Sequence, residues 1–317
     1  MEKSEFKAFQ DRIRNLYIEH DEINRIWKRL DKNRLNKKEG IENDDSPIHL
    51  YIEGKPGAGK SMAAKKYVKR NKGYTNTDDD GTEIDIKPVI YMTLPVPFTY
   101  KGFYNNILKA MNLPARKADV DAIKNQAFEM LKELEVEMLI IDELDYLLAS
   151  TFVQQRAVME NIKDIANSAD VCLVCVGTLA IEKLRTLNTQ HIRRYPRTVL
   201  SHFETCDKSF REFIKSIEDQ LALPQELLDW SKPGSVFPEL LHSLTGGLVG
   251  WIKPILREAF DILGVFDDDF NDFNILKNLD GNVLAEAQKN IIGEFAENDM
   301  EKILANELDK EKDEDSA

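Results

Sequence analysis

Eight consecutive residues have the spacing of a loop that binds phosphate through its backbone. Residues 54–61 read GKPGAGKS and fit the pattern GxxxxGK[ST] at every position, between a strand-like run and a helix-like run. Glycines let phosphate oxygens approach backbone N–H groups, and the N-terminus of the following helix adds partial positive charge. In this pattern Lys60 reaches the β- and γ-phosphates, and the Ser61 hydroxyl ligates Mg²⁺. We therefore expect ATP and Mg²⁺ to bind at Gly54, Lys55, Pro56, Gly57, Ala58, Gly59, Lys60, Ser61 and Met62.

Two acids at the end of an apolar run form a second chemical signal. Residues 138–141 are Met-Leu-Ile-Ile, and Asp142 and Glu143 follow directly. In open α/β sheets, ligands bind outside the carboxyl ends of the strands, which is where these acids would lie. We expect Asp142 to hold Mg²⁺, mainly through water, and Glu143 to polarise the attacking water as a general base. Two acids on an ordinary loop are the alternative.

A hydroxyl and a group of arginines could complete the site. Thr178 ends the apolar run "VCLVCVGT", where it could position the water or read the γ-phosphate, although a helix N-cap is the alternative. Arg193, Arg194 and Arg197 follow in "QHIRRYPRTVL". An arginine here could reach the γ-phosphate of a neighbouring subunit and make hydrolysis depend on assembly, with Arg194 the first candidate and Arg193 the second. A solvated basic turn is the alternative.

Alternating strands and helices must position these residues. Apolar runs at 48–54, 88–94, 136–144 and 171–178 predict strands, and helical patterns lie between them, one of them with Asp119 as N-cap. Residues 75–87 are polar and are predicted to be a loop. This order predicts an α/β fold whose parallel sheet is flanked by helices. Helical patterns alone follow residue 205, and residues 4–35 also have a helical period.

The expected division has four parts. They are an N-terminal helical arm and linker (1–47), an α/β domain (48–205), a small all-α domain (206–298) and an acidic tail (299–317) with eight acids and three lysines. The net charge of −13 argues against DNA binding at first, but residues 55–74 contain seven basic residues and no acid. A local basic face is therefore compatible with an acidic chain.

The cysteines and the apolar runs indicate a reducing compartment. Cys172 and Cys175 form a CxxC, but they lie inside an apolar run and would point to opposite faces of a strand, which favours buried thiols over a metal or redox site. No apolar run reaches the ~20 residues of a membrane span. We expect a cytoplasmic protein without membrane contact.

These motifs resemble the AAA+ ATPases, and more narrowly the transposition regulators TnsC and TniB, relatives of MuB. "VEMLIIDELDYL" looks like the acidic-strand signature of that family, and "VCLVCVGT" looks like its sensor strand. "HIRRYPRTVLSHF" is similar to its arginine-bearing turn, and "TGGLVGWIKPILREAF" is similar to its lid-helix signature. Together these stretches span about residues 48–260.

The resemblance implies a bacterial, nucleoid-associated ATPase that assembles as rings or filaments on duplex DNA. Such proteins link transposase subunits to a targeting factor, which is a CRISPR effector-associated protein or a target-site DNA binder. The family's DNA-facing segment matches "PVPFTYKGF", which offers Thr99, Tyr100 and Lys101, and the next loop offers Arg116 and Lys117. Phosphate contacts there would carry little sequence information. Ordinary surface lysines are the alternative, and the lysines of the helix after residue 60 are a competing candidate.

One departure from the family concerns the lid helix. The family often has an arginine directly after the glycine that opens this helix, whereas Trp251 follows Gly250 here. Lys253 is the nearest cation and could replace that arginine at the nucleotide, and Pro254 would affect the start of the helix.

Two other classes share the central motifs. The first is a P-loop NTPase switch or scaffold that binds only protein partners, although such proteins usually continue into a long repeat array. The second is a loader of a replicative helicase, as in the IstB- and DnaC-like branch, and the lid signature argues against it.

Overall fold

The computed structural model describes residues 3–42, 48–77, 80–187, 189–223 and 226–293. The chain divides into two compact units. The first is an α/β unit, Asp21–Ser201, and the second is a helical unit that combines Met1–His20 with His202–Ala317. In the described ranges, no helix is long and apolar enough to cross a membrane.

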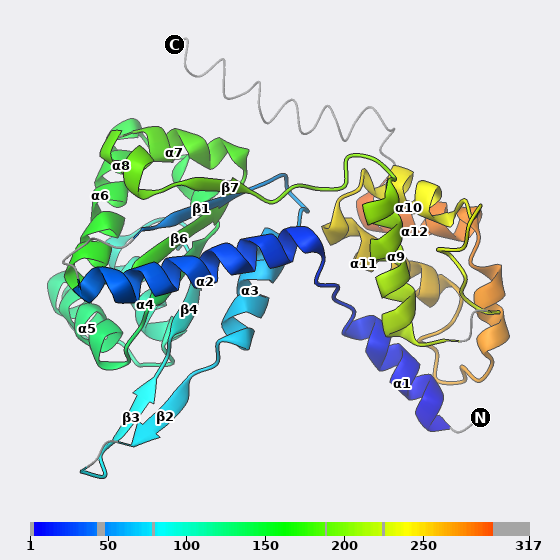
Figure 1. The fold of residues 1–317 in the computed structure, drawn as a ribbon, viewed down its shortest axis with the longest axis horizontal. Helices are drawn as coiled ribbons and strands as arrows, with labels where there is room; N and C mark the ends of the chain where they lie inside the picture. The colour runs from blue at the N-terminus through cyan, green and yellow to red at the C-terminus, as the bar shows by residue number, and fades with distance from the viewer. Residues whose placement is uncertain (1–2, 43–47, 78–79, 188, 224–225, 294–317) are drawn as a thin grey trace. The chain divides into compact units, whose positions relative to one another are not determined.

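A five-stranded parallel sheet forms the centre of the α/β unit (Figure 1). Its strand order is β4-β5-β6-β1-β7. The strands are β1 (Leu50–Glu53), β4 (Val89–Thr93), β5 (Met138–Asp142), β6 (Cys172–Gly177) and β7 (Arg197–Val199). The predicted α/β fold with helices around a parallel sheet is confirmed. The central strands β5 and β6 are buried at every residue, as expected for strands covered on both faces.

Helices cover both faces of the sheet. The helices of this unit are α2 (Asp21–Glu42), α3 (Lys60–Arg70), α4 (Tyr100–Ala110), α5 (Val120–Glu133), α6 (Phe152–Ala169), α7 (Glu182–Thr186) and α8 (Thr189–Arg194), with short 3₁₀ turns η1 (Leu144–Leu147) and η2 (Leu179–Ile181). Helices α4, α5 and α6 share one core with alternate sheet residues, which include Leu139, Leu173 and Cys175. The thiols of Cys172 and Cys175 are both buried, as predicted.

Helix α2 is attached to the P-loop helix by a buried aromatic side chain. The Trp27 indole Nε1 donates a hydrogen bond of 3.1 Å to the carbonyl oxygen of Ala63 in α3. Trp27 is 3% exposed and packs near the Tyr67 ring. Burying such a side chain stabilises a fold by about 2–3 kcal/mol, so α2 is an integral layer of the α/β unit.

The helical unit contains five α-helices and one 3₁₀ turn in its described residues. They are α1 (Lys3–Arg14), α9 (Lys208–Leu221), α10 (Phe237–Thr245), α11 (Val249–Ile262), η3 (Phe273–Asn278) and α12 (Gly281–Ile292). Its core is rich in aromatic rings, among them Phe9, Phe210 and Phe260. The edge-to-face contact of Phe9 with Phe260, at 5.6 Å between centroids, joins α1 to α11.

Three local expectations differ from the structure. Strands β2 (Tyr74–Thr77) and β3 (Glu83–Ile86) pair antiparallel where a polar loop was predicted (Figure 1). Their side chains are mostly exposed, so no apolar alternation marked them in the sequence. Strand β7 was not predicted, because its three residues follow a basic turn. Pro254 lies inside α11, which begins earlier, at Val249.

The N-terminal segment is also divided differently from the expectation. Residues 4–35 do not form one arm, because α1 packs in the helical unit and α2 belongs to the α/β unit. Each helix packs its own apolar stripe against the core of a different unit. The helical spacing of apolar residues in the sequence does not reveal that the chain passes from one unit to the other at residues 20–21. Helix α2 continues to Glu42, within the expected linker. The expected acidic tail, 299–317, lies outside the described residues.

Candidate nucleotide site

The phosphate-binding loop joins β1 to α3 at the carboxyl end of a central strand. Gly57 and Gly59 have φ of 77° and 94°, a region that side chains other than hydrogen disfavour. A Cβ at Gly54 would lie 2.7 Å from the Leu200 carbonyl oxygen, so this position also requires glycine. Helix α3 begins after Gly59, which has no side chain to cap it. Its first N–H groups are therefore suited to a phosphate oxygen.

Lys60 lies inside this loop. Its Nζ donates hydrogen bonds to the carbonyl oxygens of Gly54, at 2.7 Å, and Lys55, at 3.0 Å. Burial lowers the pKa of Lys60, and the nearby carboxylates of Asp145 and Asp142 act in the opposite direction. Lys60 and the predicted acids, Asp142 and Glu143, therefore lie close enough for their charges to interact. This arrangement suits a polyphosphate with a divalent cation.

Asp142 is held by two donors at the end of β5. The Tyr91 hydroxyl donates to its Oδ2 at 2.7 Å, and the Glu143 backbone N–H donates to its Oδ1 at 2.8 Å. Asp142 is 2% exposed. Burial, followed by the hydrogen bond to Asp142, raises the pKa of Tyr91 well above its ordinary value. Tyr91 was not predicted as a site residue, because it belongs to no recognisable motif.

Glu143 adopts a left-handed backbone conformation, with φ 59° and ψ 42°. This is uncommon for a residue with a side chain and is often found at functional sites. Burial raises the pKa of Glu143, and the negative charges of Asp142 and Asp145 add to that effect. A carboxylate with a raised pKa is a better proton acceptor, as a general base requires.

Asp145 connects the acidic strand to the sensor strand. Its Oδ2 accepts a hydrogen bond of 2.9 Å from the Thr178 backbone N–H, and the Thr178 hydroxyl also donates to this carboxylate. A Cβ at Gly177 would lie 2.5 Å from Asp145 Oδ2. Glycine at the end of β6 therefore lets the Asp145 carboxylate approach the backbone of this strand. Thr178 is also the N-cap of η2, as the alternative interpretation expected. Asp145 belongs to the same "IDELD" stretch as the predicted acids and could have been found from it.

The predicted arginines lie in different surroundings. Arg193 is exposed, and Arg194 Nη1 donates to Asn167 Oδ1 at 3.4 Å. Arg197 Nε lies 3.4 Å from Oε2 of Glu53, the fully buried residue that precedes Gly54. Among the described residues, neither Arg193 nor Arg194 has a hydrogen bond or ion pair with the phosphate-binding loop.

Glu53 was not predicted as a functional residue. Burial raises its pKa to about 7, the neighbouring Glu182 carboxyl contributes in the same direction, and Arg197 opposes them. Glu182 is itself hydrogen-bonded by Arg185, which lowers its pKa. A buried carboxyl group therefore lies directly under the start of the phosphate-binding loop.

The two predicted DNA-facing segments are adjacent in the structure. Lys101 is exposed, and its Nζ donates to the Ala118 carbonyl oxygen at 3.3 Å, beside the exposed Arg116 and Lys117. Thr99 is the N-cap of α4, where its hydroxyl accepts from the Gly102 N–H at 3.1 Å. Tyr100 packs edge-to-face on Phe98. Lys101, Arg116 and Lys117 form a basic edge, and the DNA contacts predicted for Thr99 and Tyr100 beside it stay predictions.

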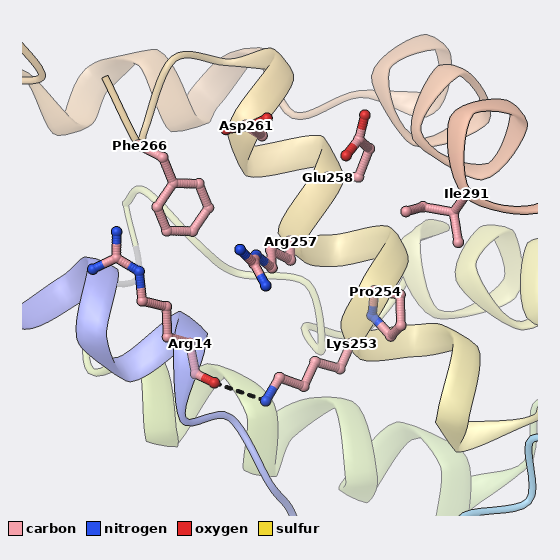
Figure 2. A pocket seen from close by; sticks show the side chains of 8 residues that line it. All are labelled: Arg14, Lys253, Pro254, Arg257, Glu258, Asp261, Phe266 and Ile291. Carbon is pink, nitrogen blue, oxygen red and sulfur yellow. Dashed lines mark hydrogen bonds between the residues drawn. The ribbon is translucent and has the colours of Figure 1, made fainter. Parts of the chain in front are cut away.

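Lys253 lies in the helical unit, on α11. Its Nζ donates to the Arg14 carbonyl oxygen at 2.8 Å (Figure 2). The same pocket, of about 380 Å³, contains Phe266, and the guanidinium groups of Arg14 and Arg257 lie 5.2 and 5.8 Å from its ring centroid. Lys253 therefore has a structural partner within its own unit.

Comparison with known proteins places the chain in a family. Residues 11–205 match the family model described as bacterial TniB protein. No curated protein sequence matches the chain significantly.

Among solved structures, three archaeal proteins are similar in fold. The Aeropyrum pernix ORC1 protein in complex with DNA has a TM-score of 0.51 and 16% identity, over 80% of this chain and 63% of that one. Cdc6p from Pyrobaculum aerophilum has a TM-score of 0.52 and 16% identity, over 83% and 66%. The Aeropyrum pernix ORC2 protein in ADPNP–ADP complexes has a TM-score of 0.53 and 14% identity, over 82% and 66%. This chain thus spans less than two thirds of the length of these proteins, and the likeness shows an AAA+ fold.

Proposed function

Since the chain belongs to the bacterial TniB family of transposition proteins, we propose that it is an ATP-hydrolysing regulator that assembles on duplex DNA. The observation that carries this proposal is that Lys60, which donates to the glycine loop, interacts electrostatically with Asp142 and Glu143 at the carboxyl end of β5. The solved structure of the similar ORC2 protein contains ADPNP and ADP, which agrees with a nucleotide at this loop.

The residues of the loop would hold ATP, and Ser61 with Asp142 would hold Mg²⁺. When bound, Mg²⁺ neutralises charge on the phosphate oxygens. Lys60 neutralises the remaining charge, and Tyr91 keeps the Asp142 carboxylate in one orientation. Glu143 accepts a proton from the attacking water. Thr178, fixed by Asp145, orients that water through its hydroxyl.

The basic edge of Lys101, Arg116 and Lys117 would contact DNA. These exposed side chains come from two adjacent segments, and the chain as a whole has a net charge of −13, which would keep the rest of the surface away from phosphates. The similar ORC1 protein was solved in complex with DNA. Contacts of this kind carry little sequence preference, which suits a regulator that acts at many sites.

Assembly would complete the catalytic site. Arg194 or Arg193 of one subunit would neutralise the γ-phosphate bound by its neighbour, so hydrolysis would follow oligomerisation. Lys253 is retained as the candidate lid cation for the nucleotide. The assembled protein would connect transposase subunits with a separate targeting factor.

Negative-stain microscopy tests this function directly. The protein is mixed with linear duplex DNA, Mg²⁺ and a non-hydrolysable ATP analogue, and rings or filaments on the DNA are expected. A double variant of Lys101→Glu and Lys117→Glu should lose the DNA-bound assemblies, whereas the exposed control Lys132→Glu on α5 should keep them. Wild-type protein that stays monomeric with DNA and analogue would refute the proposal and favour a switch that binds proteins alone.

A further inference from the structure

The segment that carries the two candidate arginines, residues 192–196, is attached to the start of β1. We call it the arginine segment. The Arg194 carbonyl oxygen accepts a hydrogen bond of 3.0 Å from the His49 backbone N–H. The next side chain, Tyr195, is fully buried, and its ring centre lies 4.4 Å from that of His49. The backbone of the arginine segment is therefore held against the strand that leads into the glycine loop.

The Arg185 guanidinium of α7 contacts the arginine segment through two carbonyl oxygens. Its Nη1 donates to the carbonyl oxygen of Ile192 at 3.3 Å and to that of Tyr195 at 3.4 Å. Helices α7 and α8 lie side by side (Figure 1). The last carbonyl groups of a helix have no partner within the helix, and an arginine can satisfy them. The two carbonyls enclose Arg193 and Arg194, so Arg185 restricts the backbone from which both side chains project.

Glu182 fixes the orientation of this guanidinium. Arg185 Nε donates to Glu182 Oε2 at 2.7 Å, and Arg185 Nη2 donates to Glu182 Oε1. Paired bonds of this kind fix the plane of the guanidinium as well as its position. The Arg185 side chain is 11% exposed, and its hydrogen bonds lower the pKa of Glu182, which is therefore ionised at neutral pH. All three nitrogens of Arg185 are used inside the subunit, which fits a supporting role.

The side chains that project from the arginine segment face different surroundings. Arg193 is exposed, and Arg194 Nη1 donates to Asn167 Oδ1 at 3.4 Å. Ile192 beside them is 42% exposed. A restrained backbone that presents cationic side chains loses little conformational freedom when those side chains bind an anion. This arrangement suits recognition of an anion outside the subunit.

We propose that Arg185 is a positioning residue for ATP hydrolysis in the neighbouring subunit. Together with Glu182, it holds the arginine segment in the orientation from which Arg194 or Arg193 contacts the neighbour's γ-phosphate. This inference rests on the proposed function, in which these arginines act across the subunit boundary. Orientation matters there, because a displacement of about 1 Å can lower a rate by about 10²-fold.

Lysine at position 185 separates position from charge. A single ammonium keeps the positive charge beside Glu182, but it cannot make the paired bonds to that carboxylate and also reach both carbonyl oxygens. Arg185→Lys should therefore loosen the arginine segment while leaving the charge of the subunit unchanged. Binding of a fluorescent ATP analogue to this variant should equal that of the wild type, because Arg185 does not contact the glycine loop in the described residues.

The test mixes two inactive variants with ATP, Mg²⁺ and linear duplex DNA. The acceptor, Arg193→Ala with Arg194→Ala, has Glu143 but no arginine to donate. The donor, Glu143→Gln, lacks the general base but has both arginines. The mixture should hydrolyse ATP, whereas each variant alone should not. Arg185→Lys placed in the donor should lower the restored turnover by about tenfold or more. The same change placed in the acceptor should leave it unchanged.

The comparison of the two placements separates positioning from a loss of folding. A subunit that folds poorly would lower turnover in either placement, whereas a positioning residue acts only in the subunit that donates the arginine. Lys132→Gln, at an exposed position of α5, is the control in the donor and should leave the restored turnover unchanged.

Two results would overturn the proposal. They are undiminished turnover with Arg185→Lys in the donor, and an equal loss with this change in the acceptor. If the donor and acceptor without Arg185→Lys give no turnover when mixed, the arginines do not act across subunits, and that part of the proposed function fails together with this inference. The unmodified mixture therefore distinguishes failure of the proposed function from failure of the positioning role alone.

Discussion

Glu53 is a buried acid whose charge should make stability depend on pH, and Glu53→Gln measures that dependence. The side chain has no exposed surface, and the partly exposed Arg197 is its ion-pair partner at 3.4 Å. Burial is the largest cause that raises its pKa from 4.5 to about 7. The unfolded chain keeps the ordinary value, so folding and proton binding are linked at this residue.

The sign follows from the direction of the shift. Below pH 4.5 Glu53 is protonated in both states, and its protonated form contributes its full stability. Between pH 4.5 and about 7, Glu53 is ionised in the unfolded chain but protonated in the folded one, so folding takes up a proton and the free energy of unfolding falls as pH rises. Above about 7, Glu53 is ionised in both states, and the folded protein contains a buried charge. At about 1.4 kcal/mol per pH unit, the interval from 4.5 to about 7 corresponds to about 3 kcal/mol.

Glutamine keeps the shape of the side chain without the charge. The variant should therefore gain stability relative to the wild type between pH 5 and pH 8. The pKa of about 7 already includes the opposing effect of Arg197, so a net gain of about 3 kcal/mol at pH 8 is expected.

Urea unfolding followed by Trp27 fluorescence is the assay. Trp27 is the one tryptophan of the α/β unit, because Trp230 and Trp251 lie in the helical unit and can be replaced by phenylalanine. Wild type and Glu53→Gln are compared in that background at pH 5 and pH 8. Glu133→Gln, at an exposed position of α5, is the control and should show no such change. An equal free-energy difference at both pH values, or a less stable variant at pH 8, would refute the reasoning.

Three further predictions concern the candidate sites. Glu143→Gln should lower ATP turnover by roughly 10²–10⁴-fold, with binding of a fluorescent ATP analogue unchanged and DNA-bound assemblies accumulating; normal turnover removes Glu143 from the mechanism. Gly177→Ala should place a Cβ 2.5 Å from Asp145 Oδ2, which costs about 1–3 kcal/mol and lowers the thermal unfolding midpoint; an unchanged midpoint contradicts this packing. Lys101→Glu should weaken duplex DNA binding and reduce the slope of log affinity against log salt by about 1, measured by anisotropy, whereas Lys132→Glu should change neither.

The parts of the site that were predictable are those encoded in short continuous stretches. The glycine loop with Lys60 and the pair Asp142–Glu143 depend on local backbone geometry, so their spacing in the sequence is sufficient. Asp119 as a helix N-cap is confirmed for the same reason.

Residues that act through strand register were not predictable. Tyr91 reaches Asp142 because β4 and β5 pair in a register that places Thr93 beside Asp142. Glu53 meets Arg197 because β1 and β7 are neighbours, although more than half of the α/β unit separates them in sequence. No residue type or spacing near Tyr91 or Glu53 specifies these pairings. Strands β2 and β3 were missed because exposed side chains leave no apolar period.

The division of the N-terminal segment has a consequence for how the chain folds during synthesis. Helix α1 belongs to a unit whose other helices begin at Lys208, and Arg12 Nε donates to the Leu221 carbonyl oxygen. At roughly 5–20 residues per second, the ribosome makes the whole α/β unit, Asp21–Ser201, before those partners exist. The apolar stripe of Phe6, Phe9 and Ile13 therefore waits about 10–40 seconds for its native contacts. Helix α1 is thus synthesised well before its partners, and the α/β unit must fold with a temporarily unpaired amphipathic helix attached to it.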